Sequence, residues 1–528
     1  MNDRQQPLPP QWAWTTLGTV AEVRLGKMLS PKAYEKGLAQ LPYLRNENVR
    51  WGHIDFTDVK LMGFKSDELA RYQVNDGDLL VCEGGEPGRA AVFSGKSGQY
   101  MYQKALHRVR PRCDVVNTKF LQLFFQHGAG QASTSQTTIA HLPLEKMLAL
   151  ALPLPPRAEQ ERIVSEAERQ FTRLDAGVAA LKRVQAQLKR YRASVLKAAC
   201  EGRLVPTEAE LARREKRDYE PAERLLARII KERRARWEAD QFAKMKAAGK
   251  LPKDDKWKAK YIEPAVPDTA ALPPLPSGWV WATLEQLAAD EPNSITDGPF
   301  GSNLKSEHYV EAGPRVVRLQ NIGEGRFLDE HAHISRDHFD RLKKHRVYPG
   351  DLVIAALSER PPRACSIPES LGDAIVKADC VRFKPDAALA QSRYLLATLN
   401  SETTRALLSD KVHGVGRPRL NLGEIRSIAI PLPPQQEQLR IIEEVEDQFS
   451  IIDASEASVQ AGLVRAAHLR QAILRLAFEG ALVPQSPKDE PASKLLERIS
   501  VSVENKPLPK QGRAKQATAV PKMKKATR

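Results

Sequence analysis

The chain has 528 residues, of which 42% are apolar, and a formal net charge of +16 at pH 7. That apolar content is enough for two or three ordinary cores, and the positive charge favours a polyanionic partner, because a basic surface attracts phosphate backbones and releases their counterions. No stretch approaches the ~18 uninterrupted apolar residues that span a bilayer, and the N-terminus lacks a signal pattern. The sequence therefore predicts a soluble, cytoplasmic protein with no membrane partner.

The chain opens with a tryptophan-rich block that occurs a second time. LPPQWAWTTL stands at 8–17, and LPSGWVWATL repeats it at 275–284. The paired tryptophans Trp12 and Trp14 of the first copy thus recur in the second. This separation is too long for a solenoid repeat and about right for two copies of a domain.

Five further blocks recur in the same order. In the first of them, YLRNENVRWGHI and VRLQNIGEGRF, Arg45 aligns with Arg318 and Asn48 with Asn321. Six blocks in one order exclude chance similarity, so the chain is predicted to be a duplication of a globular domain followed by a long helix. The five blocks are 43–54 with 317–327, 74–81 with 347–354, 148–164 with 425–442, 199–206 with 477–484, and 220–229 with 490–499.

The two parts of each repeat differ in character. Residues 1–155 and 275–433 have short apolar runs broken by Gly, Pro and Asn, which predicts mixed α/β domains with many strands and loops. Residues 157–201 contain no proline and place apolar side chains at steps of three, four and seven, the spacing of a heptad stripe. PLPP precedes each helix, and Gly202 and Gly480 stand where each helix is expected to stop.

Two amphipathic helices of this length cannot each bury a stripe alone. We expect them to pair with each other as an antiparallel coiled coil with a pseudo-twofold relation between the repeats, which makes the pair a ruler between two globular domains. The alternative is that each helix packs along its own globular domain. The candidate helix-pairing residues are Phe171, Leu174, Val178, Leu181, Leu188, Phe449, Ile452, Val459 and Ala466.

Two segments fall outside the repeat comparison. The first is the connector between the repeats, residues 207–274, which is rich in charge and helix formers. It could dock a partner, although a solvated helix is favoured. Its Pro-rich end is expected to be flexible. The C-terminal tail has eight Lys or Arg from Asn505 onward and no acid, and it could strengthen DNA binding without specificity. The expected division is 1–155 first domain, 156–206 first long helix, 207–274 connector and linker, 275–433 second domain, 434–500 second long helix and following segment, and 501–528 basic disordered tail.

DGPFGSNLKSEHYVEAGPRVVRLQNI, the PGDLV strand and above all IPLPPQQEQLRII before a long helix resemble the specificity subunit of type I restriction-modification systems, over roughly residues 8–500. The resemblance implies an α+β fold with two target recognition domains, separated by two long antiparallel helices, that each read half of a bipartite, asymmetric DNA site. It also implies a non-catalytic subunit whose helices set the spacer and dock two adenine-methylating modification subunits. Restriction subunits with translocase and nuclease activity complete the family's complex, and S-adenosylmethionine, ATP and Mg²⁺ are expected in these partners.

The two domains differ most between the repeated blocks, where residues 27–41 share little with 299–313. Different loops on one scaffold predict different half-sites, because contacts to base edges read sequence while phosphate contacts position the domain. Arg and Asn suit base edges and Lys suits phosphates, but the recurrence of Arg45 and Arg318 favours a framework role equally. The candidates for DNA contact are Lys27, Lys32, Arg45, Asn48, Arg89, Lys104 and Arg108 in the first domain, and Lys305, Arg318, Asn321, Lys377, Arg417 and Arg419 in the second.

The sequence predicts no catalytic residue and no metal site. It has no G-x-x-x-x-G-K-[ST] loop, no G-x-G-x-x-G fingerprint and no [DN]-P-P-[YF] segment. His331 and His333 alternate on a possible strand without further ligands, and the five cysteines form no C-x-x-C pair. The alternatives to a specificity subunit are a coiled-coil scaffold that binds DNA without sequence preference, and a fused single-chain methyltransferase or nuclease, against which the missing motifs count.

Overall fold

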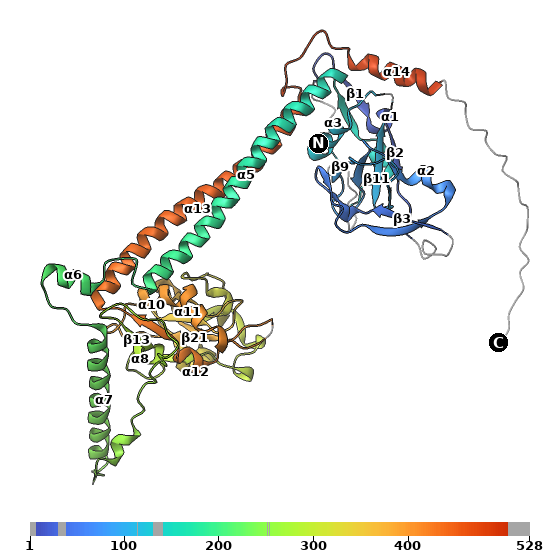
Figure 1. Ribbon diagram of the computed structural model, residues 1–528. Helices are drawn as coiled ribbons and strands as arrows, with labels where there is room; N and C mark the ends of the chain where they lie inside the picture. Colours follow the sequence, from blue (N-terminus) through green and yellow to red (C-terminus); the bar gives the residue numbers. More distant parts are fainter. Residues whose placement is uncertain are drawn as a thin grey trace, which may run out of the picture. The chain divides into compact units, whose positions relative to one another are not determined.

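The computed structural model describes residues 7–29, 38–112, 114–129, 141–250, 252, 254–414 and 416–504. The chain forms two compact units, residues 1–181 with 461–528 and residues 182–460. Each unit contains one globular domain and about half of each long helix (Figure 1). The boundary between the units thus falls near the middle of both helices, whereas the division expected from the sequence treats each helix as a separate segment.

The first domain contains two four-stranded sheets. One has the order β2 (Ala21–Leu25), β11 (Leu106–Pro111), β8 (Leu79–Cys82), β9 (Ala90–Val92), with all neighbours antiparallel. The other has the order β6 (Lys60–Phe64), β3 (Ala39–Leu44), β10 (Tyr100–Tyr102), β7 (Gln73–Val74), in which β3 and β10 are parallel. The remaining elements are the antiparallel pair β1 (Ala13–Thr16) and β12 (Ala151–Leu154), the pair β4 (Val49–Arg50) and β5 (His53–Ile54), and helices α1 (Leu17–Val20), α2 (Leu69–Tyr72), α3 (Thr118–Gln126) and α4 (Leu144–Leu148).

The second domain repeats this topology. Its sheets have the orders β14 (Ile295–Asp297), β21 (Cys380–Phe383), β18 (Leu352–Ala355), β19 (Arg363–Ser366), and β16 (His333–Ile334), β15 (Tyr309–Val317), β20 (Ala374–Val376), β17 (Arg346–Val347). Again the middle pair of the second sheet, β15 and β20, is parallel. The remaining elements are the antiparallel pair β13 (Val280–Thr283) and β22 (Ala429–Leu432), and helices α8 (Leu284–Leu287), α9 (Arg336–Arg341), α10 (Ser392–Leu399), α11 (Glu402–Leu407) and α12 (Leu422–Arg426).

The central strands β8 and β18 show why the Gly-Asp blocks recur. Gly77 and Gly350 have φ of 81° and 84°, a region that residues with a Cβ rarely adopt. The apolar runs that follow them, LLVC and LVIA, are buried at every position. The prediction of a tight turn leading into a buried strand is confirmed in both domains.

The long helices are α5 (Arg157–Cys200) and α13 (Gln435–Phe478), each of 44 residues and therefore about 66 Å long. Each ends at the predicted glycine, since Gly202 and Gly480 have φ of 64° and 71°. The amide of Arg203 donates to the Ala198 carbonyl, closing the last turn of α5, and the residue after Gly480 donates to α13 in the same way.

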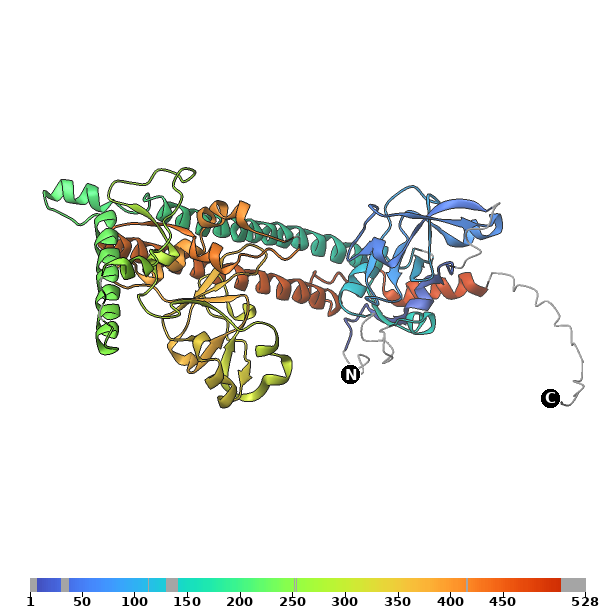
Figure 2. The same ribbon diagram turned by 90° about the horizontal axis from the view of Figure 1, so that it is seen from below.

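The two helices run antiparallel, and in each unit their halves lie side by side (Figures 1 and 2). In each unit an arginine of one helix forms an ion pair with an aspartate of the other helix. Its guanidinium also lies over a phenylalanine ring of that helix, 4.4 Å from the ring centre in the first unit and 4.3 Å in the second. The two arginines occupy equivalent places in the repeats, as the pseudo-twofold relation requires. The contacts are Arg470 with Asp175 and Phe171 in the first unit, and Arg192 with Asp453 and Phe449 in the second.

A heptad seam runs along α13. Its buried residues Val445, Ile452, Val459, Ala466 and Ile473 recur at every seventh position, as expected for helices that pair. The first turns of α5 also pack into the core of the first domain, so the structure combines pairing with packing on a domain. Of the candidate pairing residues, Phe171, Ile452, Val459 and Ala466 are buried and Leu174, Val178, Leu181, Leu188 and Phe449 are half-buried.

The tryptophan blocks hold the ends of both helices. Trp12 Nε1 donates to both oxygens of Glu159 (3.1 Å each) in the first turn of α5, while Gly480 at the end of α13 lies against the same ring. In the second unit Trp279 Nε1 donates to Glu437 of α13 (2.9 Å). We call these two sites the helix joints; they are formed by Trp12, Glu159, Gln160 and Gly480, and by Trp279, Glu437, Gln438 and Gly202.

The connector contains α6 (Glu208–Glu215) and α7 (Ala222–Ala247), and the equivalent of α7 in the second repeat is α14 (Ala492–Glu504). The expectation of a flexible Pro-rich end is wrong, because this segment is bound to the second domain: Trp281 Nε1 donates to the Pro273 carbonyl (3.1 Å) and Thr283 Oγ1 to that of Ala265 (2.7 Å). The predicted disordered tail overlaps α14 at 501–504, and the rest of it lies outside the described residues.

Candidate nucleic-acid interface

Four loops of the first domain meet where β2, β8 and β10 end and α4 begins. Backbone hydrogen bonds hold them together: the Lys104 amide donates to the Lys27 carbonyl and the Leu142 amide to that of Glu83, both at 2.8 Å. We call the described residues of these loops, 26–29, 83–89, 103–105 and 141–143, loop cluster 1.

The equivalent loops of the second domain meet in the same way. The Ala356 amide donates to the Asp379 carbonyl (2.8 Å), and the Leu420 amide donates to Ala356 (2.9 Å). We call the described residues 298–308, 356–362, 377–379, 412–414 and 416–420 loop cluster 2. In both clusters a rigid pair of sheets positions the surface loops, and binding residues usually lie on such loops.

The exposed side chains of the two clusters differ in chemistry. Cluster 1 exposes Met28, Leu29 and Lys104. Cluster 2 exposes Phe300, Lys305 and three arginines, Arg360, Arg417 and Arg419, which provide an aromatic face and three guanidinium groups. Apolar groups suit the thymine methyl group, arginine suits guanine, and lysine suits phosphates, so the two clusters are equipped for different duplex sequences.

Arg419 is the best-positioned arginine of cluster 2. Its Nη2 is 2.9 Å from Asp379 Oδ1, its guanidinium lies 5.7 Å from the centre of the Phe300 ring, and its side chain is still 48% exposed. Asp379 thus orients the guanidinium without covering it. Arg417, two residues earlier on the same turn, is exposed.

The candidate pair Arg45 and Asn48 forms a turn lock. Asn48 is buried, accepts a bond from the Arg45 amide (2.9 Å) and donates to two carbonyls, while Arg45 ion-pairs with Asp58 (2.7 Å). In the second domain Asn321 is buried and accepts from the Arg318 amide (2.8 Å) in the same way. All four side chains are engaged within their domains, which supports the framework role over base reading.

Arg108 also points inward. Only 2% of its side chain is exposed, and it donates to the Gln73 carbonyl (2.9 Å) and to Glu22 Oε1 (3.3 Å). It has no surface to present to a base edge. Sequence reasoning missed two ion pairs of the framework, Arg110 with Asp78 and Arg382 with Asp351. In each pair the arginine contacts the aspartate of the Gly-Asp turn at 2.7 Å. The two arginines stand at different strand positions, because Arg382 lies opposite Val353 as Arg108 lies opposite Leu80, so only the recurring Gly-Asp aspartate marks these pairs in the sequence.

Four other candidates are partly engaged. Lys27 Nζ contacts Glu68 Oε2 at 2.5 Å, and Arg89 contacts Glu86 at 2.9 Å, so both charges are neutralised within loop cluster 1 or beside it. Lys305 is exposed and 3.5 Å from a neighbouring glutamate, and Lys377 lies 5.5 Å over a tyrosine ring. Lys32 lies outside the described residues.

Burial affects two titratable groups in and beside loop cluster 1. Burial raises the pKa of the Glu83 carboxyl, an effect that the charges of His141 and Lys104 oppose. Burial also raises the pKa of the Cys82 thiol to about 11, so this thiol stays protonated and unreactive at neutral pH. The same cause raises the pKa values of Cys200, Cys365 and Cys380.

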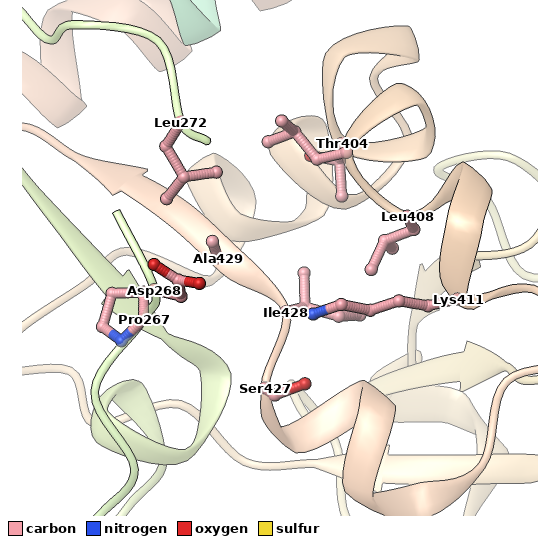
Figure 3. Close-up of a pocket in the computed structure, with 10 residues that line it drawn as sticks. Pro267, Asp268, Leu272, Thr404, Leu408, Lys411, Ser427, Ile428 and Ala429 are labelled. Atoms are coloured by element: carbon pink, nitrogen blue, oxygen red, sulfur yellow. The ribbon is translucent and has the colours of Figure 1, made fainter. Parts of the chain in front are cut away.

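The described residues include no group of three or more His, Cys, Asp or Glu that could hold a metal ion. The rings of His331 and His333 are 5.9 Å apart, but His333 Nδ1 contacts the Gly313 carbonyl (2.7 Å). The second domain has a small cavity of about 60 Å³, which Asp268 and Lys411 enter from opposite sides (Figure 3). A cavity of this size accommodates a few waters at most. No helix in the described part of the chain is long and apolar enough to cross a membrane.

Comparisons with known proteins agree on one group. A family model described as the type I restriction modification DNA specificity domain matches residues 9–190 and 363–460, together more than half of the chain. The type I restriction enzyme EcoBI specificity subunit of Escherichia coli is 26% identical over 403 residues, covering 74% of this chain and 73% of that protein. The EcoAI specificity subunit of the same species is 23% identical over 534 residues, covering 90% and 84%.

A solved chain from a structure of the type I R-M system has a similar fold. The TM-score is 0.58 at 17% sequence identity, and the match covers 90% of this chain and 100% of the solved one.

Proposed function

The chain belongs to the type I restriction-modification specificity family, and from that premise we propose that it reads a bipartite, asymmetric duplex site with one half-site for each globular domain. Specificity subunits of this family are non-catalytic, confer DNA sequence specificity and act with methylase and restriction subunits. The finer proposal is that the paired helices dock two modification subunits, which methylate adenine at the site chosen by this chain. Restriction subunits join the same complex, which works in the cytoplasm.

One observation carries the proposal: the two domains share a topology and a set of buried framework residues but expose different side chains in their loop clusters. If both domains read the same sequence, the equivalent exposed residues would be expected to match. Instead Met28 and Lys104 stand in one cluster, and Phe300 and Arg419 in the other. Different side chains on one framework support two different half-sites.

The test is a map of methylated adenines in host DNA. The chain is co-expressed with its modification subunit, and the map is repeated with the chain omitted. We expect a two-part asymmetric motif that appears only with the chain. If the modification subunit is folded and bound to the chain yet no new motif appears, the proposal is wrong and a scaffold without sequence preference is favoured.

The independence of the half-sites can be tested by replacing residues 27–41 with the equivalent loop of a related chain. We expect one half-site of the methylated motif to change and the other to remain. Replacement of 299–313 is the matched experiment in the second domain and should change the opposite half. A change in both half-sites from either replacement would contradict independent reading.

The paired helices are proposed to set the number of unread base pairs. Deleting one heptad from each helix at equivalent positions, 179–185 and 457–463, removes about 10 Å of helix, which corresponds to about three base pairs at ~3.4 Å each. We expect a shorter spacer between unchanged half-sites in the methylation map. Deleting a heptad from α5 alone mismatches the seam and serves as the control, for which no ordered complex is expected.

A further inference from the structure

The outer part of α7 projects from the second domain. The first half of the helix packs into the core through Leu225, Leu226 and Ile229, and this part ends at Arg233, which is buried and donates to the Gln286 carbonyl (2.9 Å) and to Asp386 (2.7 Å). No described residue of α7 beyond Arg233 is buried. Figure 1 shows the helix extending beyond α6 and the chain returning along it toward α8.

An aromatic cluster fixes this projection. The ring of Trp237 on α7 lies 6.1 Å from that of Trp257 and 5.3 Å from that of Tyr261 on the returning chain. Arg234 Nη1 adds a 2.9 Å contact with Glu263 across the same gap. These contacts join two antiparallel segments into one body, which we call the basic arm and define as residues 234–250 and 254–263.

The arm concentrates positive charge. Its residues, 234–250 and 254–263, contain eight Lys or Arg and five Asp or Glu, a formal surplus of three. Four of its five acids, Glu238, Asp254, Asp255 and Glu263, contact basic side chains of the arm; for example, Glu238 contacts Arg234 and Lys258. In the described part of the chain, four exposed lysines of the arm form no ion pair. They are Lys244, Lys246, Lys250 and Lys260.

The second repeat has the same bias of charge at the equivalent place. Its α14 matches the start of α7 in sequence, and the residues that follow it, 505–528, contain eight Lys or Arg and no acid. Each repeat is therefore followed by a basic extension, although the two extensions have unrelated sequences. Positive charge is what the two extensions share in sequence.

We propose that the basic arm binds the phosphate backbone of the duplex outside the bases read by loop cluster 2. The proposal rests on the DNA-reading function above. Unpaired lysines are suited to phosphates, whereas the centre of a protein interface is depleted in lysine and enriched in aromatic groups. The rings of Trp237, Trp257 and Tyr261 already contact one another. The exposed lysines without an ion pair outnumber the exposed large apolar side chains of the arm, Phe242 and Ile262, so an acidic protein surface is the less suitable partner.

The test uses the full chain in complex with its modification subunit and measures duplex binding at several salt concentrations. In the test variant, Lys244→Gln, Lys246→Gln, Lys250→Gln and Lys260→Gln are combined. Each phosphate contact contributes about 0.9 to the slope of log K against log salt, so we expect the slope to fall by about two to four and affinity at moderate salt to fall about tenfold or more. The loss should be equal for duplexes with an intact site and with a mutated site, and the methylated motif should not change.

Two controls separate charge from structure. The four lysines changed to arginine should keep the wild-type slope, and Lys488→Gln with Lys494→Gln, beside and on α14, should leave it unchanged. An unchanged slope in the four-glutamine variant would overturn the proposal. Loss of the modification subunit from that variant, with the slope of the remaining chain unchanged, would also overturn it and identify a protein partner for the arm. Failure of the wild-type complex to give any motif would instead contradict the proposed function.

Discussion

The helix joints and the loop clusters belong to the same two domains, yet the two halves of the chain agree at the joints and differ at the clusters. At the joints, Trp12 and Trp279 donate to glutamates at equivalent positions of the long helices. At the clusters, one domain exposes Met28, Leu29 and Lys104, whereas the other exposes Phe300, Lys305 and three arginines. The residues that are the same in both halves therefore hold each domain to its long helices. The residues that differ between the halves are those exposed to the ligand.

The largest expected effect comes from breaking a joint. Trp279→Ala removes a buried ring and leaves the buried carboxylate of Glu437 without its indole donor, and we expect it to lower the free energy of unfolding by about 3–5 kcal/mol. Denaturant unfolding of the complex measures this loss. Trp14→Ala is the control from the other copy of the tryptophan block, because Trp14 is 38% exposed, and it should cost less than about 1 kcal/mol. Equal losses in both variants would show that the tryptophan blocks do not stabilise the protein through the helix joints.

The next effect sharpens the comparison at the clusters. Arg419→Ala should reduce discrimination at one base pair of one half-site by about 1–3 kcal/mol, measured by competition with duplexes carrying single base changes. Lys104→Ala in the other cluster should instead weaken binding uniformly across sequences, since lysine contacts phosphates. Altered preference in both half-sites after Arg419→Ala would contradict the assignment of one half-site to each domain.

A smaller effect tests the equivalence of the two helix contacts. Arg192→Ala and Arg470→Ala each remove a partly exposed ion pair and a cation-π contact, and each should cost less than about 1 kcal/mol. Because the contacts are equivalent, the two losses measured by thermal unfolding should agree within a few tenths of a kcal/mol. A loss confined to one variant would show that the two ends of the helix pair are not energetically alike.

The smallest effect is a pH dependence at the joints. Burial raises the pKa of the Glu159 and Glu437 carboxyls above their ordinary value of 4.5, opposed by the indole donors. The folded state therefore binds these protons more tightly than the unfolded state, and this stabilisation is lost as pH rises from about 4.5 through the raised pKa values. Combined Glu159→Gln and Glu437→Gln stays neutral, so its melting temperature relative to wild type should increase by a few degrees or less between pH 4.5 and pH 7. A constant difference across that range would show that neither carboxyl titrates there.

Repetition made much of the fold predictable. The duplicated blocks predict two domains of one design, the Gly-Asp turns, and helices that stop at Gly202 and Gly480, because each of these features depends on local sequence. The boundary between the two compact units, which falls in the middle of the long helices, could not be predicted in this way. It depends on which residues from distant parts of the chain pack together, as Phe171 does with Arg470.

The candidate interface was less predictable, because residue type does not fix side-chain direction. Arg108 and Arg417 were both candidates as arginines, yet Arg108 is buried within β11 and Arg417 is exposed. The recurrence of Arg45 and Asn48 in the second half indicated a framework role, which their contacts support. The exposed apolar residues of the clusters, such as Phe300, carry no sequence signal of their own and become visible only when the loops meet.

The first unit is built from both ends of the chain, and this has a consequence for the order of folding. Its core includes Ile473, Leu474 and Phe478, and the Ala492 amide donates to the carbonyl of Gln11. These partners leave the ribosome more than 300 residues after the first domain, a delay of tens of seconds at ~5–20 residues per second. The second unit is one continuous stretch, 182–460, so it can close first. The domain that is synthesised first is therefore expected to be completed last, and in the interval it exposes the surface that the end of α13 later covers.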